Sequence, residues 1–184
     1  MKMMVRLLLS LCLVTGGMTS KGQNENAELT KQPVKARIDP RHRFGSNDSV
    51  GDVIVTYSDG TADAWTRKGN CMDPKVSPQG YVGWIVCELT PNQKSVRLYN
   101  GIPIGSQLAI CYRGKLIAKL ASAKPFIEGW GFLEDGQHVV IKSRAAHGVA
   151  MIERFGLHNG PAEAAVVAYA ANLPDWARPF RDEP

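Results

Sequence analysis

The sequence has 184 residues, of which 22 are Lys or Arg and 17 are Asp or Glu, so the formal net charge is +5. This surplus is small and spread along the chain, and no run of basic residues interleaved with aromatic residues is present. Composition and charge therefore argue against a nucleic-acid-binding module, which needs a concentrated basic surface. The length is sufficient for one domain with a hydrophobic core.

The first 20 residues have the order of a secretory signal peptide. Lys2 and Arg6 supply a charged start, residues 7–14 form an apolar run, and small residues follow up to Ser20. The run is shorter than the roughly 20 apolar residues that a membrane-spanning helix needs. We therefore predict that residues 1–20 are removed and that the mature protein, with its charge reduced from +5 to +3, is periplasmic or secreted and has no membrane span.

Residues 21–51 contain few apolar side chains and show no sustained hydrophobic period. Such a segment buries too little surface to repay the entropy lost on ordering. We predict a flexible linker here, followed by a β domain over residues 52–184.

From residue 52 onward, short runs of β-branched and aromatic residues alternate with turns that contain Gly, which readily adopts the positive φ that these turns need. Turns are expected at Ser58-Asp59-Gly60, Pro78-Gln79-Gly80, Arg113-Gly114, Glu134-Asp135-Gly136 and His158-Asn159-Gly160-Pro161. About ten short strands in this space predict an antiparallel all-β domain. Residues 161–171 favour a strand, but their alanines leave a helix starting at Pro161 open.

Two segments repeat one pattern, a strand that leads into a Gly-containing turn and then an apolar strand. They are KVSPQGYVGWIVCEL (75–89) and GFLEDGQHVVIKSR (131–144). Aligning Gly80 with Gly136 places Val76 over Phe132 and Val82 over His138. Internal repeats of this size are typical of propeller blades or solenoid units.

The first turn, Ser77-Pro78-Gln79-Gly80, resembles the Ser-Pro-Asp-Gly turn of periplasmic β-propellers with TolB and WD40-like repeats. Gln79 replaces the Asp of that pattern, and Leu133-Glu134 replaces Ser-Pro in the second turn. The resemblance implies about two and a half blades over residues 52–170, whereas propellers close with four to eight. We therefore expect an open stack or sandwich of small sheets, or completion by another chain.

The candidate chemistry is sparse. Arg144 and His147 lie in the predicted loop SRAAHGVA, with Ser143 and Asp135 nearby in sequence. A hydrolase using the 143–147 loop is conceivable, but the Gly-x-Ser-x-Gly elbow is missing, and proximity in sequence is not triad geometry. No His or Cys spacing indicates a metal site, and no phosphate-binding loop is present, so no cofactor is predicted.

Most tryptophans are expected in structural roles, and two of them are also candidates for partner binding. Trp130 is expected between sheets, and Trp176 lies between prolines after the last strand. Trp176 is expected to pin a capping tail, in which Phe180 also covers the edge of the last strand, or to anchor a partner. The residues that we select for partner binding are Trp130, Arg144, His147 and Trp176.

Cys71 and Cys87 are predicted to form a disulfide. If Ser77 faces Tyr81 across the turn, Cys71 faces Cys87, and opposite Cβ atoms lie about 4.5–5.5 Å apart. A one-residue slip would turn the thiols to opposite faces.

Together these features predict an exported, non-catalytic β domain that binds or scaffolds a protein or ligand partner, with the hydrolase as the alternative. Free strand edges, near residues 52–67 and 163–169, make self-association another expectation.

Overall fold

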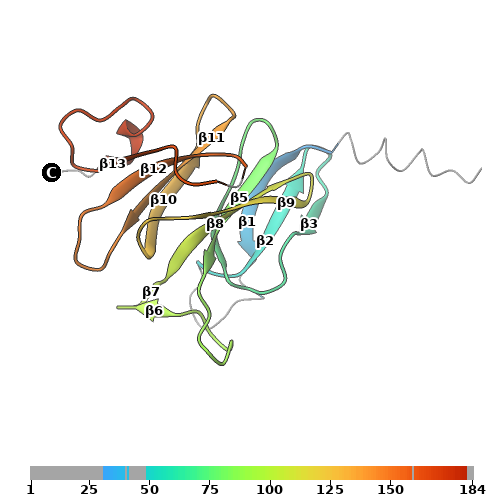
Figure 1. Cartoon of the computed structure of the whole chain (residues 1–184). Helices are drawn as coiled ribbons and strands as arrows, with labels where there is room; N and C mark the ends of the chain where they lie inside the picture. The colour runs from blue at the N-terminus through green and yellow to red at the C-terminus, as the bar shows by residue number, and fades with distance from the viewer. Residues whose placement is uncertain (1–30, 40, 42–48, 159, 182–184) are drawn as a thin grey trace, which may run out of the picture. The chain divides into compact units, whose positions relative to one another are not determined.

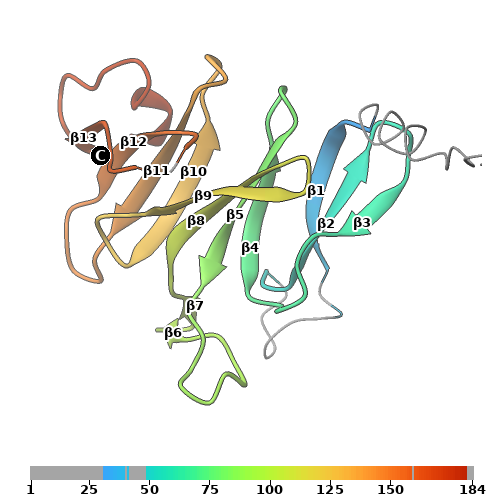
Figure 2. The ribbon, with the colours of Figure 1, turned by 45° about the vertical axis from the view of Figure 1, so that its right-hand side comes forward.

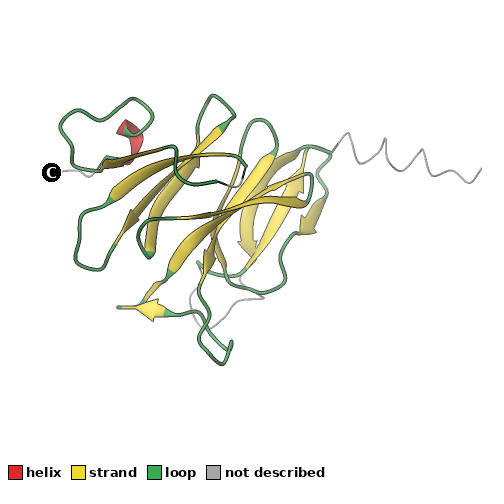
Figure 3. Ribbon diagram, in the orientation of Figure 1, coloured by secondary structure: helices red, strands yellow, loops and turns green. Residues whose placement is uncertain are grey.

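The structure is a computed structural model that describes residues 31–39, 41, 49–158 and 160–181 (Figure 1). The described residues fall within one unit, Lys31–Pro184. They form antiparallel sheets with only short helical segments, so the predicted all-β class is confirmed (Figure 3). The predicted signal peptide, residues 1–20, lies outside the described residues.

Three sheets account for most of the strands. The first contains β1 (Pro33–Asp39), β2 (Asp52–Tyr57) and β3 (Ala62–Ala64). The second contains β4 (Cys71–Val76), β5 (Tyr81–Cys87), β8 (Gly105–Tyr112) and β9 (Lys115–Ala121). The third contains β10 (Phe126–Phe132), β11 (His138–Arg144), β12 (Met151–Gly156) and β13 (Ala164–Val167). A two-stranded hairpin, β6 (Leu98–Tyr99) and β7 (Ile102–Pro103), is inserted in the second sheet, and a 3₁₀ turn, η2 (Arg178–Phe180), follows the third.

Each sheet is a meander in which spatial neighbours are also sequence neighbours, apart from the β6–β7 insertion. Figure 2 shows the three sheets standing side by side. Val53 and Val55 of the first sheet share a buried cluster with Trp84 of the second. The opposite face of the second sheet packs on the third, so both of its faces are buried.

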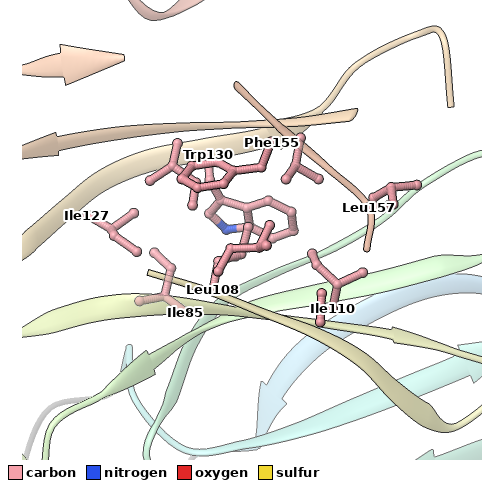
Figure 4. Close-up of a cluster of buried hydrophobic side chains, with 11 residues drawn as sticks. Ile85, Leu108, Ile110, Ile127, Trp130, Phe155 and Leu157 are labelled. Carbon is pink, nitrogen blue, oxygen red and sulfur yellow. The ribbon is translucent and has the colours of Figure 1, made fainter. Parts of the chain in front are cut away.

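Trp130 is at the centre of the contact between the second and third sheets (Figure 4). Its indole lies over Gly83, where an added Cβ would come within 2.6 Å of the ring. The indole Nε1–H donates a 2.9 Å hydrogen bond to the Asp73 carbonyl oxygen. Trp130 thus joins the two sheets by both packing and a hydrogen bond.

The sequence repeat corresponds to the first hairpins of the second and third sheets. The match is confirmed before the turn, since Val76 and Phe132 occupy equivalent places at the ends of β4 and β10. After the turn it is wrong by one residue. The first turn closes from Ser77 to Tyr81, whereas the second closes from Leu133 to His138 and holds one more residue. Val82 is therefore equivalent to Val139, and both are fully buried against the preceding sheet.

The predicted linker is wrong in its middle part. Residues 33–39 form β1, which pairs with β2. Ala36 and Ile38 pack against the buried cluster between the first two sheets. Two inward-facing apolar side chains are enough to hold this strand on the core, because β2 supplies the partners for its backbone hydrogen bonds. The rest of the predicted linker lies largely outside the described residues.

The predicted register of Cys71 and Cys87 is also corrected. Val76↔Val82 and Lys75↔Gly83 follow the expected pairing, but a bulge then shifts it, so that Cys71 faces Val86. Cys71, Cys87 and Cys111 are all buried free thiols. The bulge includes Asp73, whose φ is 48°, and it directs the Asp73 carbonyl towards Trp130.

The end of the chain follows one prediction and departs from another. Residues 164–167 are a strand, as favoured, and pair with β12. Leu173, Trp176, Ala177 and Phe180 join Val140 and Ile152 in one cluster. Because Val140 and Ile152 lie on the face of the third sheet that is turned away from the second, the tail covers a face of that sheet rather than the edge of its last strand.

Candidate functional site

The β6–β7 hairpin is formed by a local signal. Tyr99 pairs with Ile102 across a two-residue loop, Asn100-Gly101, whose φ values are 49° and 80°. A tight hairpin turn with two positive φ angles strongly favours Asn-Gly. The sequence reasoning missed this hairpin, although the Asn-Gly pair between RLY and IPI was the signal that could have found it.

The base of the hairpin is fixed to the ends of β5 and β8. The Arg97 N–H donates to the Glu88 carbonyl at 2.7 Å, and the Glu88 N–H donates to the Ile104 carbonyl at 2.8 Å. The Arg97 guanidinium also lies 2.7 Å from the Glu88 carboxylate. The hairpin is therefore held in place where it leaves the second sheet.

Apolar side chains gather on this hairpin without being buried. Leu98 is 53% exposed, Tyr99 37% and Ile102 61%. Seven large hydrophobic side chains are exposed among the described residues, and three of these seven lie on this one six-residue hairpin. A further one, Val149, is 42% exposed in the loop that follows β11.

Side-chain contacts join the hairpin to the third sheet. The Tyr99 hydroxyl lies 3.4 Å from His147 Nε2. The rings of Tyr99 and Phe126 are 5.4 Å apart at an angle of 53°. Tyr99 and Ile102 share one face of the hairpin and Leu98 lies on the other. We use the name hairpin patch for the exposed side chains on both faces together with two residues of the loop after β11: Leu98, Tyr99, Ile102, His147 and Val149.

Arg144 lies beside the hairpin patch and is oriented by two acceptors. Its Nε is 2.7 Å from Glu128 Oε1, and its Nη1 donates to the Gly148 carbonyl at 3.5 Å. Arg144 and His147, which were predicted from one loop, therefore lie at the same end of the third sheet. A guanidinium next to exposed aromatic and aliphatic groups is a common feature of protein-binding surfaces.

The other two predicted site residues lie elsewhere. Trp130 is 1% exposed and belongs to the core between two sheets. Trp176 packs on the outer face of the third sheet, with its ring 5.5 Å from the Arg154 guanidinium carbon. Neither contributes to the hairpin patch.

The residues named for the hydrolase alternative have separate partners. Ser143 is fully buried, and its hydroxyl lies 3.4 Å from the Glu153 carboxylate. Asp135 pairs with His138 at 2.7 Å, whereas His147 contacts Tyr99. In this arrangement Ser143, His147 and Asp135 do not form a triad.

The thiols have the properties of core residues. Burial raises the pKa of Cys71 and Cys111 to about 11 and that of Cys87 to about 12. A thiol must ionise to act as a nucleophile or a metal ligand. These three side chains are therefore protonated at neutral pH and serve packing.

Within residues 31–39, 41, 49–158 and 160–181, no cluster of three or more His, Cys, Asp or Glu residues is arranged to hold a metal ion. In that same part of the chain, no helix combines the length and hydrophobicity that crossing a bilayer requires. No known protein family, curated protein or solved structure matches this chain.

Proposed function

We propose that this protein is an exported, non-catalytic β domain that binds a protein partner through the hairpin patch. The observation that carries the proposal is the clustering of exposed Leu98, Tyr99 and Ile102 on a hairpin that is anchored at its base. Contiguous exposed apolar groups with polar neighbours mark interaction sites on soluble proteins. Tyr and Arg are also the residue types most enriched where binding energy concentrates.

The propeller-like resemblance remains part of this proposal. Two successive four-stranded meanders, each presenting an equivalent Val to the sheet before it, support a blade-like relationship. The TolB and WD40-like repeats would then supply a scaffold from which an inserted hairpin projects. Fold analogy alone does not identify a partner, so the hairpin patch is the part to test.

Site-specific photocrosslinking in the native host tests the proposal. Benzoylphenylalanine placed at Ile102 should give a crosslinked species of one defined mass. The same group at Leu116, which is 50% exposed on β9, is the matched control and should give none. A species of twice the mass of the chain would identify a second copy as the partner.

A competition experiment then tests whether the crosslink depends on the apolar side chains of the hairpin. Excess unlabelled protein should abolish the crosslinked species, whereas an excess of the L98S/I102S variant should compete about tenfold less well, as expected for residues worth more than about 1 kcal/mol. Equal crosslinking from positions 102 and 116, or equal competition by the variant, would refute the proposal.

One variant separates the proposal from the hydrolase alternative. His147→Ala should leave the fold intact, because the side chain lies in an exposed loop. A hydrolase that uses the 143–147 loop would lose its turnover on this change. A binding domain would show only weaker competition in the crosslinking assay.

A further inference from the structure

The C-terminal tail, residues 171–181, covers the outer face of the third sheet. Leu173 is 5% exposed and Ala177 is fully buried. Figure 1 shows this segment, in red, turning back beside the third sheet after β13. Gly131 brings the tail close, because a Cβ there would lie 3.3 Å from the Phe180 ring. The tail therefore seals an apolar face that would otherwise be open.

A chain of charged groups leads from the tail into the sheet. Trp176 stacks near Arg154, whose guanidinium carbon is 5.5 Å from the ring centre. Arg154 Nε lies 3.8 Å from Glu163 Oε2 and makes no hydrogen bond, although the atom is buried. The same Glu163 oxygen lies 3.0 Å from His138 Nε2. Glu163 Oε2 thus lies between the Arg154 guanidinium and the His138 imidazole, and it is within hydrogen-bonding distance of the imidazole alone.

The backbone around this carboxylate leaves room for it. His138 is paired with Gly156 on the neighbouring strand. A Cβ on Gly156 would come within 3.0 Å of Glu163 Oε1. A side chain at position 156 would crowd the Glu163 carboxylate, so Gly156 leaves room for the contact between Glu163 and His138.

The second nitrogen of His138 faces another carboxylate. His138 Nδ1 lies 2.7 Å from Asp135 Oδ2. Asp135 is held in the turn by the N–H groups of Gln137 and His138, which donate to it at 2.8 and 3.1 Å. An imidazole can donate from both nitrogens only when it is protonated. Both His138 nitrogens therefore have a carboxylate oxygen within reach, and both contacts can be hydrogen bonds at once only in the imidazolium form.

We propose that the C-terminal tail is a proton-controlled cover, fastened when His138 is protonated and loosened when His138 is neutral. On deprotonation the Nε2 proton of His138 passes to solvent, and the Nδ1–H of His138 stays hydrogen-bonded to Asp135. The Nε2 lone pair then faces Glu163, whose carboxylate moves to the unbonded Nε of Arg154. A closer carboxylate offsets more of the Arg154 charge and so weakens the attraction between the guanidinium and the Trp176 ring, because the cation–π interaction depends on that charge.

The other charged groups near this network are ion-paired with one another. A histidine is the side chain that ordinarily titrates between about pH 5 and 8. On the tail, Asp175 pairs with Arg178 at 2.9 Å. Further along the outer face, Glu128 lies 3.9 Å from Lys142 and 2.7 Å from Arg144. His138 is the histidine of this network.

Hydrogen exchange of the full-length protein, corrected for the intrinsic pH dependence of exchange, tests the proposal at pH 5.5 and pH 8. Protection of residues 173–180 should fall about two- to fivefold at the higher pH, as expected for an exposed cation–π contact. His138→Gln should abolish this pH dependence. Glu163→Gln should abolish it as well, and it provides a second test if the first variant folds poorly.

The matched control is His158→Gln, which removes an exposed histidine close in sequence but outside the network. This variant should retain the full pH dependence. Protection that is independent of pH in the wild-type protein would overturn the proposal. So would a pH dependence that persists in both His138→Gln and Glu163→Gln, or one that disappears in His158→Gln.

Discussion

At the scale of single residues, the join between the second and third sheets depends on one large side chain and the space left for it. Trp130 is nearly fully buried, and it occupies the space over Gly83. Lys75 also hydrogen-bonds the Trp130 carbonyl, and its ammonium lies 5.1 Å from the indole centre. Interiors packed at crystal-like density tolerate little added volume at such a point.

Gly83→Ala should therefore destabilise the protein. The new methyl group would meet the Trp130 ring at 2.6 Å and Ile110 Cδ1 at 2.8 Å. We expect the free energy of unfolding to fall by about 1–3 kcal/mol, as for other overpacked cores, in urea denaturation followed by tryptophan fluorescence. Gly129→Ala is the control, because a Cβ at Gly129 meets nothing within 4 Å, and it should change stability by less than about 0.5 kcal/mol. Equal effects of the two changes would contradict this account.

At the scale of elements, the turns could be predicted and the irregularities could not. The Arg113-Gly114 and Glu134-Asp135-Gly136 turns form as expected, because their φ requirements are local. The bulge at Asp73 was missed, although the following Pro74 is a local signal for a bulge or an edge strand. The contact that takes up the Asp73 carbonyl comes from the Trp130 side chain, 57 positions away, and no local pattern reveals that contact.

The candidate site divides in the same way. Arg144 and His147 were selected because a loop after a buried strand often carries function, and the structure places both next to exposed apolar groups. Leu98, Tyr99 and Ile102 were missed, because their two-residue strands are too short to show alternation and the Asn100-Gly101 turn signal was overlooked. Trp130 was expected between sheets and lies there, so its side chain is not exposed for the partner binding for which it was also selected.

One contact in the first sheet should make the stability of the fold depend on pH. Asp39, at the end of β1, is 3% exposed and accepts hydrogen bonds from the Arg41 side chain at 2.8–3.2 Å and from the Arg41 N–H at 3.1 Å. These bonds, the side-chain ones first, hold the pKa of Asp39 well below its usual range. A lowered pKa stabilises the fold above the value of the unfolded chain, about 3.9, and this contribution is lost as the pH falls below that value.

Thermal unfolding of the wild-type protein should therefore show a decrease in Tm between pH 5 and pH 2.5 that is steeper than in Asp39→Asn. Arg41→Gln removes the cause of the pKa shift and should give the same shallower slope as Asp39→Asn. The double variant should add nothing further. Parallel pH profiles for all four proteins would show that the Asp39–Arg41 contact does not contribute to acid stability.

At the scale of the whole molecule, the stack of sheets has two ends that are treated differently. The second sheet is buried on both faces. The outer face of the third sheet is sealed by the tail, whereas the outer face of the first carries exposed Lys35, Arg37, Ala62 and Ala64. Charged and small side chains suit an end that faces water, and the apolar Val140 and Ile152 require a cover.

Removing residues 171–184 should consequently convert a monomer into an associating protein. The loss exposes Val140 and Ile152, which are fully buried beneath the tail, and Leu173 alone contributes roughly 2 kcal/mol of burial. We expect light scattering to show the full-length chain as a monomer and the truncated chain as concentration-dependent oligomers, with a lower Tm. Removing residues 182–184 alone leaves Leu173, Trp176 and Phe180 in place and should preserve the monomer. A truncated chain that stays monomeric and soluble at high concentration would show that the face beneath the tail needs no cover.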